Sequence, residues 1–148
     1  MSFLDRLADI GKNFLADAER EFARVSTRTT FERVCQAAFL IARADGSFDA
    51  SEKAMLQKVV SSKLPHFKGT DIAAAINAAE DELLFSDVAG IATLLANIGH
   101  AKGSSDAQLI MTVALAIANA DGLFDEDEQK MAARIAAALG LAPAEYGL

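Results

Sequence analysis

Apolar residues recur every three to four positions along most of this chain, which is the period of an amphipathic α-helix. Alanine and leucine are abundant, sustained β-branched alternation is absent, and there are two prolines in 148 residues. Helix is therefore the favoured state throughout, and we predict an all-α fold of about seven helices. From the stripes and their interruptions, the expected helices span residues 2–24, 29–44, 49–64, 70–84, 86–100, 107–120 and 125–139.

The first predicted helix has one apolar stripe, made of Leu4, Leu7, Gly11, Leu15, Ala18, Phe22 and Val25. Its other face carries acidic and basic side chains in nearly equal number, and the chain has no tryptophan to act as an interfacial anchor. We expect this stripe to pack on the rest of the protein, although binding to a membrane surface is the alternative.

Local signals mark several helix ends. Thr29 and Glu32 have the spacing of a capping box, and Ser105 is placed to cap the sixth helix. Glycine after Asp45 and after Leu139 predicts two helix ends. Residues 107–120 are apolar on nearly every face, which predicts the buried central rod of the domain.

One stretch of the chain occurs twice. Residues 41–55 and 117–131 are identical at 9 of 15 aligned positions, with an offset of 121 − 45 = 76 residues. We therefore predict a single domain over residues 1–148 with an internal repeat, residues 30–62 and 106–139. The two repeats should be helical hairpins related by an approximate twofold axis.

Charge and composition exclude several function classes. The net charge is −7, which repels nucleic acid and anionic lipid and attracts cations or basic partners. No apolar run approaches the ~20 residues that span a bilayer, and no signal peptide is evident. The single cysteine, Cys35, lies in an apolar helical stretch and suits a reducing compartment. We expect a cytoplasmic protein that binds no nucleic acid and does not insert into membranes.

The repeated motif is Asp-Gly-x-Phe-Asp-x-x-Glu at a junction between two helices. Its carboxylates are Asp45, Asp49 and Glu52 in the first copy and Asp121, Asp125 and Glu128 in the second. The second aspartate and the glutamate of each copy have capping-box spacing at the start of a helix. Capping therefore explains four of the six side chains.

Asp45 and Asp121 need another explanation, because each lies near a helix C-terminus, where the helix dipole disfavours an acid. One explanation is an Asx-type turn onto the following amides. The other is a divalent cation, Ca²⁺ or Mg²⁺, held by oxygen ligands of the motif. The spacing is not that of an EF-hand, and the absence of nearby Cys or His excludes structural zinc. Five carboxylates between residues 121 and 128 make the second copy the stronger candidate.

Signatures of an enzyme are missing. His66 and His100 lie outside any motif that would pair them with a nucleophile. A phosphate-binding glycine loop and a GxSxG elbow are also absent. We predict that the protein is not an enzyme.

The chain resembles the tellurite-resistance TerB family. The likeness rests on the opening residues 1–5, the two Asp-Gly junctions and the tail over residues 137–148. The resemblance implies an all-helical cytoplasmic adaptor of a bacterial stress system that confers resistance to tellurite and sometimes to phages and colicins. It also implies partners, namely a TerC-type membrane protein and calcium-binding TerD-type proteins, and a metal-binding role for the six motif carboxylates.

We therefore expect a non-enzymatic adaptor that binds a divalent cation at its acidic junctions and is recruited by a partner to the inner face of the membrane. The alternative is a metal-independent scaffold whose acidic face docks a basic segment of a membrane protein.

Overall fold

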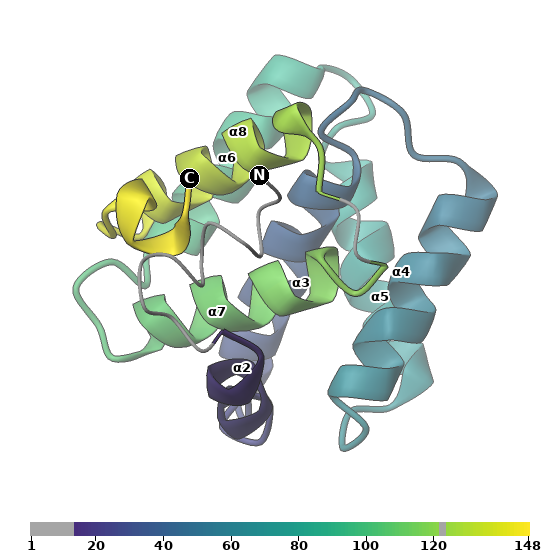
Figure 1. Ribbon diagram of the computed structural model, residues 1–148. Coiled ribbons are helices and arrows are strands. Elements are labelled where there is room, and N and C mark those ends of the chain that lie inside the picture. Colours follow the sequence, from purple (N-terminus) through teal and green to yellow (C-terminus); the bar gives the residue numbers. More distant parts are fainter. Residues whose placement is uncertain (1–13, 122–123) are drawn as a thin grey trace.

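The computed structural model describes residues 14–121 and 124–148, and this part of the chain contains seven α-helices and no strand. The prediction of an all-α fold of about seven helices is confirmed (Figure 1). The helices are α2 (Phe14–Phe22), α3 (Arg28–Ala42), α4 (Ala50–Lys63), α5 (Gly69–Asp81), α6 (Asp87–Gly99), α7 (Asp106–Ala118) and α8 (Glu126–Ala138), followed by a short 3-10 helix, η1 (Pro143–Tyr146).

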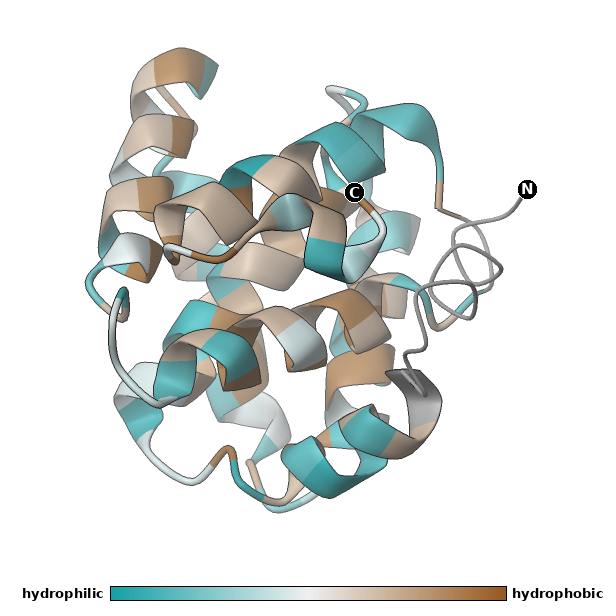
Figure 2. Ribbon diagram, turned by 60° about the vertical axis from the view of Figure 1, so that its left-hand side comes forward, coloured by the Kyte–Doolittle hydropathy of each residue, from teal (hydrophilic) through white to brown (hydrophobic). Residues whose placement is uncertain are grey.

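Helices α3 and α7 pack against each other in the middle of the molecule, with α6 and α8 above them and α4 and α5 to the right in Figure 1. Nine of the thirteen residues of α7 are buried, which confirms the prediction of a buried central rod. Coloured by hydropathy, the helices in the middle are largely apolar and most peripheral loops are hydrophilic (Figure 2). The buried apolar side chains form one cluster that draws on both halves of the chain.

The first helix is described from Phe14 onward, and it ends at Phe22. Three members of its predicted stripe, Ala18, Phe22 and Val25, are buried, and α2 packs on α7. Of the other members, Leu4, Leu7 and Gly11 lie outside the described residues. Among the described helices, none is long and apolar enough to cross a membrane.

The two helical hairpins have matching backbone conformations at positions 76 residues apart. The C-caps of α3 and α7 are Arg43 (φ −101°, ψ 14°) and Asn119 (φ −92°, ψ 6°). The N-caps of α4 and α8 are Asp49 (φ −80°, ψ 176°) and Asp125 (φ −77°, ψ 177°). Gly46 adopts a φ of 92°, which favours glycine, whereas its counterpart Gly122 lies outside the described residues. The twofold relation of the whole repeats stays a prediction.

Two predicted caps are wrong. Helix α3 is capped by Thr27, whose hydroxyl accepts a hydrogen bond from the Thr30 amide at 3.2 Å. The helix begins at Arg28, before Thr29, and the hydroxyl of the buried Thr30 donates to Asp106 Oδ2 at 3.2 Å. Ser105 occupies the N-cap position of α7 but makes no capping bond with its side chain. The Ser104 hydroxyl accepts from the Asp106 amide instead.

Helix α5 also ends three residues before the predicted end at residue 84. After Asp81 the backbone hydrogen bonds change to a three-residue spacing. The amides of Leu83 and Leu84 donate to the carbonyl oxygens of Glu80 and Asp81. Ser86 then takes an extended conformation and caps α6 through its hydroxyl, which accepts from the Ala89 amide. The chain must therefore leave the helical conformation before Ser86.

Candidate functional site

The two acidic junctions open onto one pocket. It has a volume of about 510 Å³ and lies between the α3–α4 hairpin and the α7–α8 hairpin. Five of the six predicted carboxylates line it, namely Asp45, Glu52, Asp121, Asp125 and Glu128. Asp49 does not belong to the lining. In Figure 1 the α3–α4 loop lies at the upper right of the molecule, and α7 ends below it, to the right of the centre.

Residues that correspond in the two repeats face each other across this pocket. The lining contains three pairs of residues that are 76 positions apart: Ala42 with Ala118, Asp45 with Asp121, and Glu52 with Glu128. The same offset relates Thr30 and Asp106, whose side chains form a hydrogen bond between α3 and the start of α7. The pocket is therefore one shared feature of both repeats, whereas the sequence suggested a separate site at each junction.

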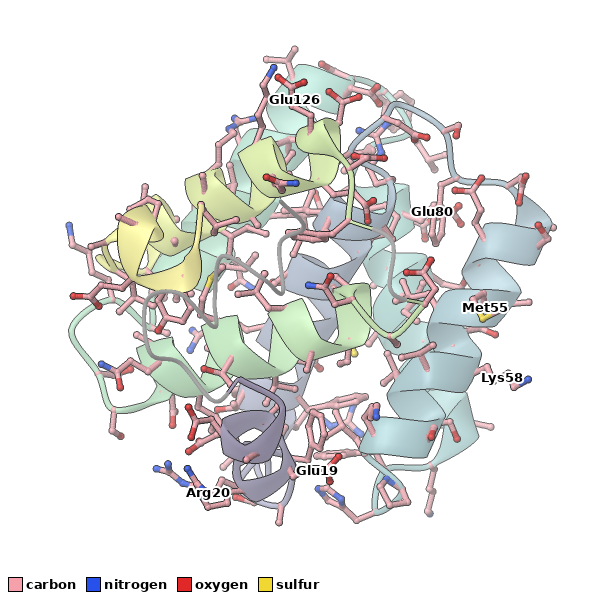
Figure 3. The ribbon with its side chains drawn as sticks, viewed as in Figure 1. Glu19, Arg20, Met55, Lys58, Glu80 and Glu126 are labelled. Atoms are coloured by element: carbon pink, nitrogen blue, oxygen red, sulfur yellow. The ribbon has the colours of Figure 1, made fainter. Side chains whose placement is uncertain are left out.

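The floor of the pocket is apolar and was not foreseen. It is formed by Met55, Leu56 and Val59 of α4 and by Ile117 of α7. Met55 is 55% exposed and lies on α4 at the right of Figure 3. The signal in the sequence was weak, because apolar residues on an amphipathic helix usually belong to the core. The site combines an acidic rim with an apolar floor.

Asp49 and Glu52 form the predicted capping box of α4. Asp49 Oδ1 accepts from the Glu52 amide at 2.8 Å, and Glu52 Oε1 accepts from the Asp49 amide at 3.3 Å. Hydrogen bonds from the Glu52 amide and from the Ser51 hydroxyl lower the pKa of Asp49. Asp49 is thus engaged in holding the start of α4, consistent with its position outside the pocket lining.

Asp125 and Glu128 make the same capping box at the start of α8. Asp125 Oδ1 accepts from the Glu128 amide at 2.8 Å, and Glu128 Oε1 accepts from the Asp125 amide at 3.1 Å. Unlike Asp49, Asp125 also faces the pocket. The two junctions therefore share their capping chemistry but contribute differently to the pocket.

Asp45 makes the Asx-type turn that was one of its two predicted roles. Its Oδ1 accepts from the Ser47 amide at 3.0 Å and from the Ser47 hydroxyl at 3.1 Å. These bonds offset the unfavourable position of the acid near the end of α3. The side chain remains exposed and reaches the pocket lining, so the turn does not remove it from the site.

Glu128 is the most perturbed carboxyl of the pocket. Partial burial raises its pKa from 4.5 to about 7, and the negative charges of Asp125 and then Asp121 contribute to the rise. Negative charge is thus concentrated at the second junction, which the sequence analysis identified as the stronger candidate for a cation site. A positively charged group in the pocket would relieve this repulsion.

The donor chemistry of the pocket suits a hard cation, because all its acidic ligands are carboxylate oxygens. The present arrangement of these carboxylates suits a cation less well. Within residues 14–121 and 124–148, no group of three or more Asp, Glu, His or Cys side chains is close enough to hold a metal ion. A bound ion would need further oxygen donors, such as backbone carbonyls or water.

Cys35 and His66 show no arrangement for nucleophilic catalysis. Cys35 is buried, and burial raises the pKa of its thiol to about 12, so the reactive thiolate is suppressed. His66 Nε2 lies 2.6 Å from the carbonyl oxygen of Val25, and its ring contacts Phe67.

A larger pocket of about 650 Å³ lies between α2, α7 and the C-terminal segment. Its charged lining includes Arg20 and Arg24, which pair with Asp17 and Glu21 three residues earlier in the chain. Glu145 leaves this lining with an excess of one negative charge, whereas the smaller pocket has five carboxylates and no basic side chain in its lining. The smaller acidic pocket is the better candidate site.

Fold and pocket together define a small all-helical domain in which two acidic helix junctions share one apolar-floored pocket. Residues 35–148 match the model of the family described as tellurite resistance protein TerB. The match covers more than half of the chain, and the chain belongs to the TerB family. This is a family of helical, non-catalytic domains associated with tellurite resistance. No curated protein and no solved structure matches the chain.

Proposed function

We propose that this TerB-family domain is a non-enzymatic adaptor of a bacterial tellurite-resistance and stress-response system, and that its shared acidic pocket binds one divalent cation, Ca²⁺ or Mg²⁺. The observation that carries the proposal is the convergence of five carboxylates from both repeats on one pocket. Such a pocket concentrates negative potential on a chain whose net charge is already −7.

The crowding at the second junction supports a cation as the ligand. Glu128 holds its proton up to a pH of about 7 because its carboxylate would be partly buried beside Asp125 and Asp121. A divalent ion would replace that proton and neutralise the neighbouring charges. Binding should therefore release protons and strengthen as the pH rises through 7.

The proposed partners follow from the family and from charge. A TerC-type membrane protein and TerD-type proteins are the partners that the family suggests, and a basic surface on either would be attracted to the acidic rim. Such a partner would bring this cytoplasmic adaptor to the inner face of the membrane. The bound ion would link the acidic pocket to the partner.

A second candidate function is favoured by the apolar floor. Met55, Leu56, Val59 and Ile117 offer more apolar surface than a dedicated ion site needs. A basic, partly apolar segment of a membrane protein could place its aliphatic atoms on this floor and its Lys or Arg head groups on the rim. This scaffold would work without metal.

The test is a calorimetric titration of chelator-treated protein with Ca²⁺ and with Mg²⁺. The shared pocket predicts one ion per chain, and Asp45→Asn or Asp121→Asn alone should each weaken binding. Asparagine keeps a side-chain oxygen for the Ser47 turn while removing the charge. Asp49→Asn is the matched control, because Asn caps a helix about as well as Asp and residue 49 lies outside the lining.

If neither ion produces heat, the cation proposal fails. The scaffold then remains if a Lys-rich peptide with apolar residues binds equally well in EDTA and in calcium, with an affinity that falls as salt rises. Two independent ions per chain would also contradict the shared pocket.

A further inference from the structure

The corner between α5 and α6 exposes three large apolar side chains within five residues. Leu84 is 69% exposed, Phe85 is 102% exposed and Val88 is 82% exposed. Single exposed apolar residues are normal on protein surfaces, but three within five residues on one corner are unusual. We call Leu84, Phe85 and Val88 the corner patch.

The corner is held firmly in its conformation. Ser86 caps α6 through its hydroxyl, and the Gly90 amide donates to the Ser86 carbonyl at 2.9 Å. Gly90 lies so close to the preceding turn that a Cβ there would be 2.3 Å from the Glu82 carbonyl oxygen. The patch is therefore presented by a tightly packed turn.

An ion pair ties the corner to the core. The buried side chain of Arg43, at the end of α3, donates to Asp87 Oδ2 at 3.2 Å. This contact anchors the first turn of α6 next to the patch. An aromatic side chain on a fixed backbone has only two side-chain torsions to order when it binds, which suits an interface anchor.

The surroundings of the corner patch are acidic. Residues 69–99 contain five Asp or Glu residues and no Lys or Arg, and three of the five, Asp71, Glu80 and Asp87, pair with basic side chains of other segments. Asp81 and Glu82 immediately precede the patch, are exposed, and form no ion pair within the described part of the chain. Glu80, which pairs with Lys53 of α4, and Glu126 of α8 lie in the same upper part of the molecule (Figure 3).

The negative charge next to the corner patch favours one kind of binding partner over the others. A second copy of the chain would bring acidic side chains against acidic side chains, and an anionic membrane would be repelled as well. A partner with a complementary surface is apolar at its centre and basic at its edge. A basic amphipathic helix has that surface, with one apolar stripe between rows of Lys or Arg.

We propose that the corner patch is a docking site for a basic amphipathic helix of a partner protein. The apolar stripe of that helix covers Leu84, Phe85 and Val88, and its basic side chains pair with Asp81 and Glu82. This surface is separate from the shared acidic pocket and does not depend on a bound cation.

The probe is a synthetic 18-residue helix with leucine on one face and lysine on the other, and the control peptide has glutamate in place of lysine. Binding is followed by fluorescence anisotropy, and the contact surface by ¹⁵N chemical-shift changes. The lysine peptide should shift amides of residues 81–90, bind less tightly in high salt, and bind far more tightly than the glutamate peptide.

Phe85→Ser should weaken binding of the lysine peptide at least tenfold. The melting temperature of the protein should not change, because Phe85 is fully exposed. Met55→Ser, at the exposed apolar side chain of the acidic pocket, tests the other site, and a loss of affinity in this variant would assign the peptide to the pocket. Asp121→Asn and addition of EDTA should also have no effect, which separates this proposal from the pocket.

Three results would overturn the proposal. Unchanged affinity in Phe85→Ser would remove the role of the patch, and shifts centred on residues 117–128 would assign the peptide to the pocket. Dimers that are lost in Phe85→Ser, measured by sedimentation in the absence of peptide, would make a second copy the occupant. If wild-type protein bound to vesicles with 30% anionic lipid and Phe85→Ser did not, the occupant of the corner patch would be a membrane.

Discussion

At the scale of single residues, Glu128 combines two roles that oppose each other. As the third residue of a capping box it accepts from the Asp125 amide, which favours the charged form. Partial burial and the nearby aspartates disfavour the charged form more strongly, so its pKa rises to about 7. The native state therefore tolerates an ionised Glu128 poorly near neutral pH.

This predicts a pH dependence of stability. An unfolded glutamate has a pKa of about 4.3, so between about pH 4.5 and 7 the folded protein binds more protons than the unfolded chain. The contribution of Glu128 to the free energy of unfolding should fall as the pH rises through that window and level off above it. Glu128→Gln keeps an acceptor oxygen, and urea unfolding from pH 4.5 to 8 should show a smaller decline.

Glu126→Gln is the control for this experiment, because it also removes one negative charge from the first turn of α8 but lies exposed. An unchanged pH profile in Glu128→Gln would show that the crowding of carboxylates at the second junction does not affect folding.

Asp125 gives a second prediction at this scale. Because its carboxylate caps α8, Asp125→Ala should lower the free energy of unfolding by about 1 kcal/mol even in chelator, where no ion contributes. Asp125→Asn retains a capping oxygen and should cost only a small part of that. Denaturant unfolding in EDTA measures both variants, and equal losses would mean that charge, rather than the cap, is what matters at this position.

At the scale of elements, the α5–α6 corner depends on close approach of two backbones. A Cβ at Gly90 would overlap the Glu82 carbonyl group, so Gly90→Ala should lower the free energy of unfolding by about 1–3 kcal/mol. Gly69→Ala is the matched control, since nothing lies within 4 Å of its Cβ position and it should be neutral or slightly stabilising. Thermal unfolding compares the two, and equal midpoints would contradict the tight packing.

Helix ends show the same dependence on neighbours. The boxes at Asp49 and Asp125 were predicted correctly because a capping box is complete within four residues. Thr29 and Ser105 were wrong because several neighbouring hydroxyls compete for each cap. At the start of α3 the hydroxyl of Thr27, two residues before Thr29, makes the capping bond.

At the scale of the whole molecule, the proposed cation site should couple the two halves of the chain. An ion that binds only the folded state stabilises it by about 2.7 kcal/mol at a hundredfold excess over Kd. Millimolar Ca²⁺ or Mg²⁺ should therefore raise the melting temperature of the wild type. Asp45→Asn and Asp121→Asn should each lose this gain, although the residues belong to different repeats.

Calorimetric melting in EDTA and in excess ion provides the measurement, with Asp49→Asn as the variant that should keep the gain. Stabilisation that survives in Asp45→Asn but not in Asp121→Asn would place the ion at the second junction alone.

Features that depend on near neighbours along the chain could be predicted from the sequence. The period of apolar residues predicted an all-α fold with seven main helices, and the apolar run at residues 107–120 identified the central rod. The Asp-x-x-Glu spacing identified both capping boxes, and the repeated junctions with the tail pointed to the TerB family. These features follow from backbone geometry and side-chain chemistry over a few residues.

What the acidic junctions form together depends on tertiary packing. The packing of α3 against α7 brings Asp45 and Asp121 to one pocket and leaves Asp49 outside it, although all three belong to the same motif. It also supplies the apolar floor from α4 and α7, and it leaves the corner patch exposed. These contacts are between residues tens of positions apart in the sequence. The spacing of such residues along the chain does not determine how far apart they lie in the folded protein.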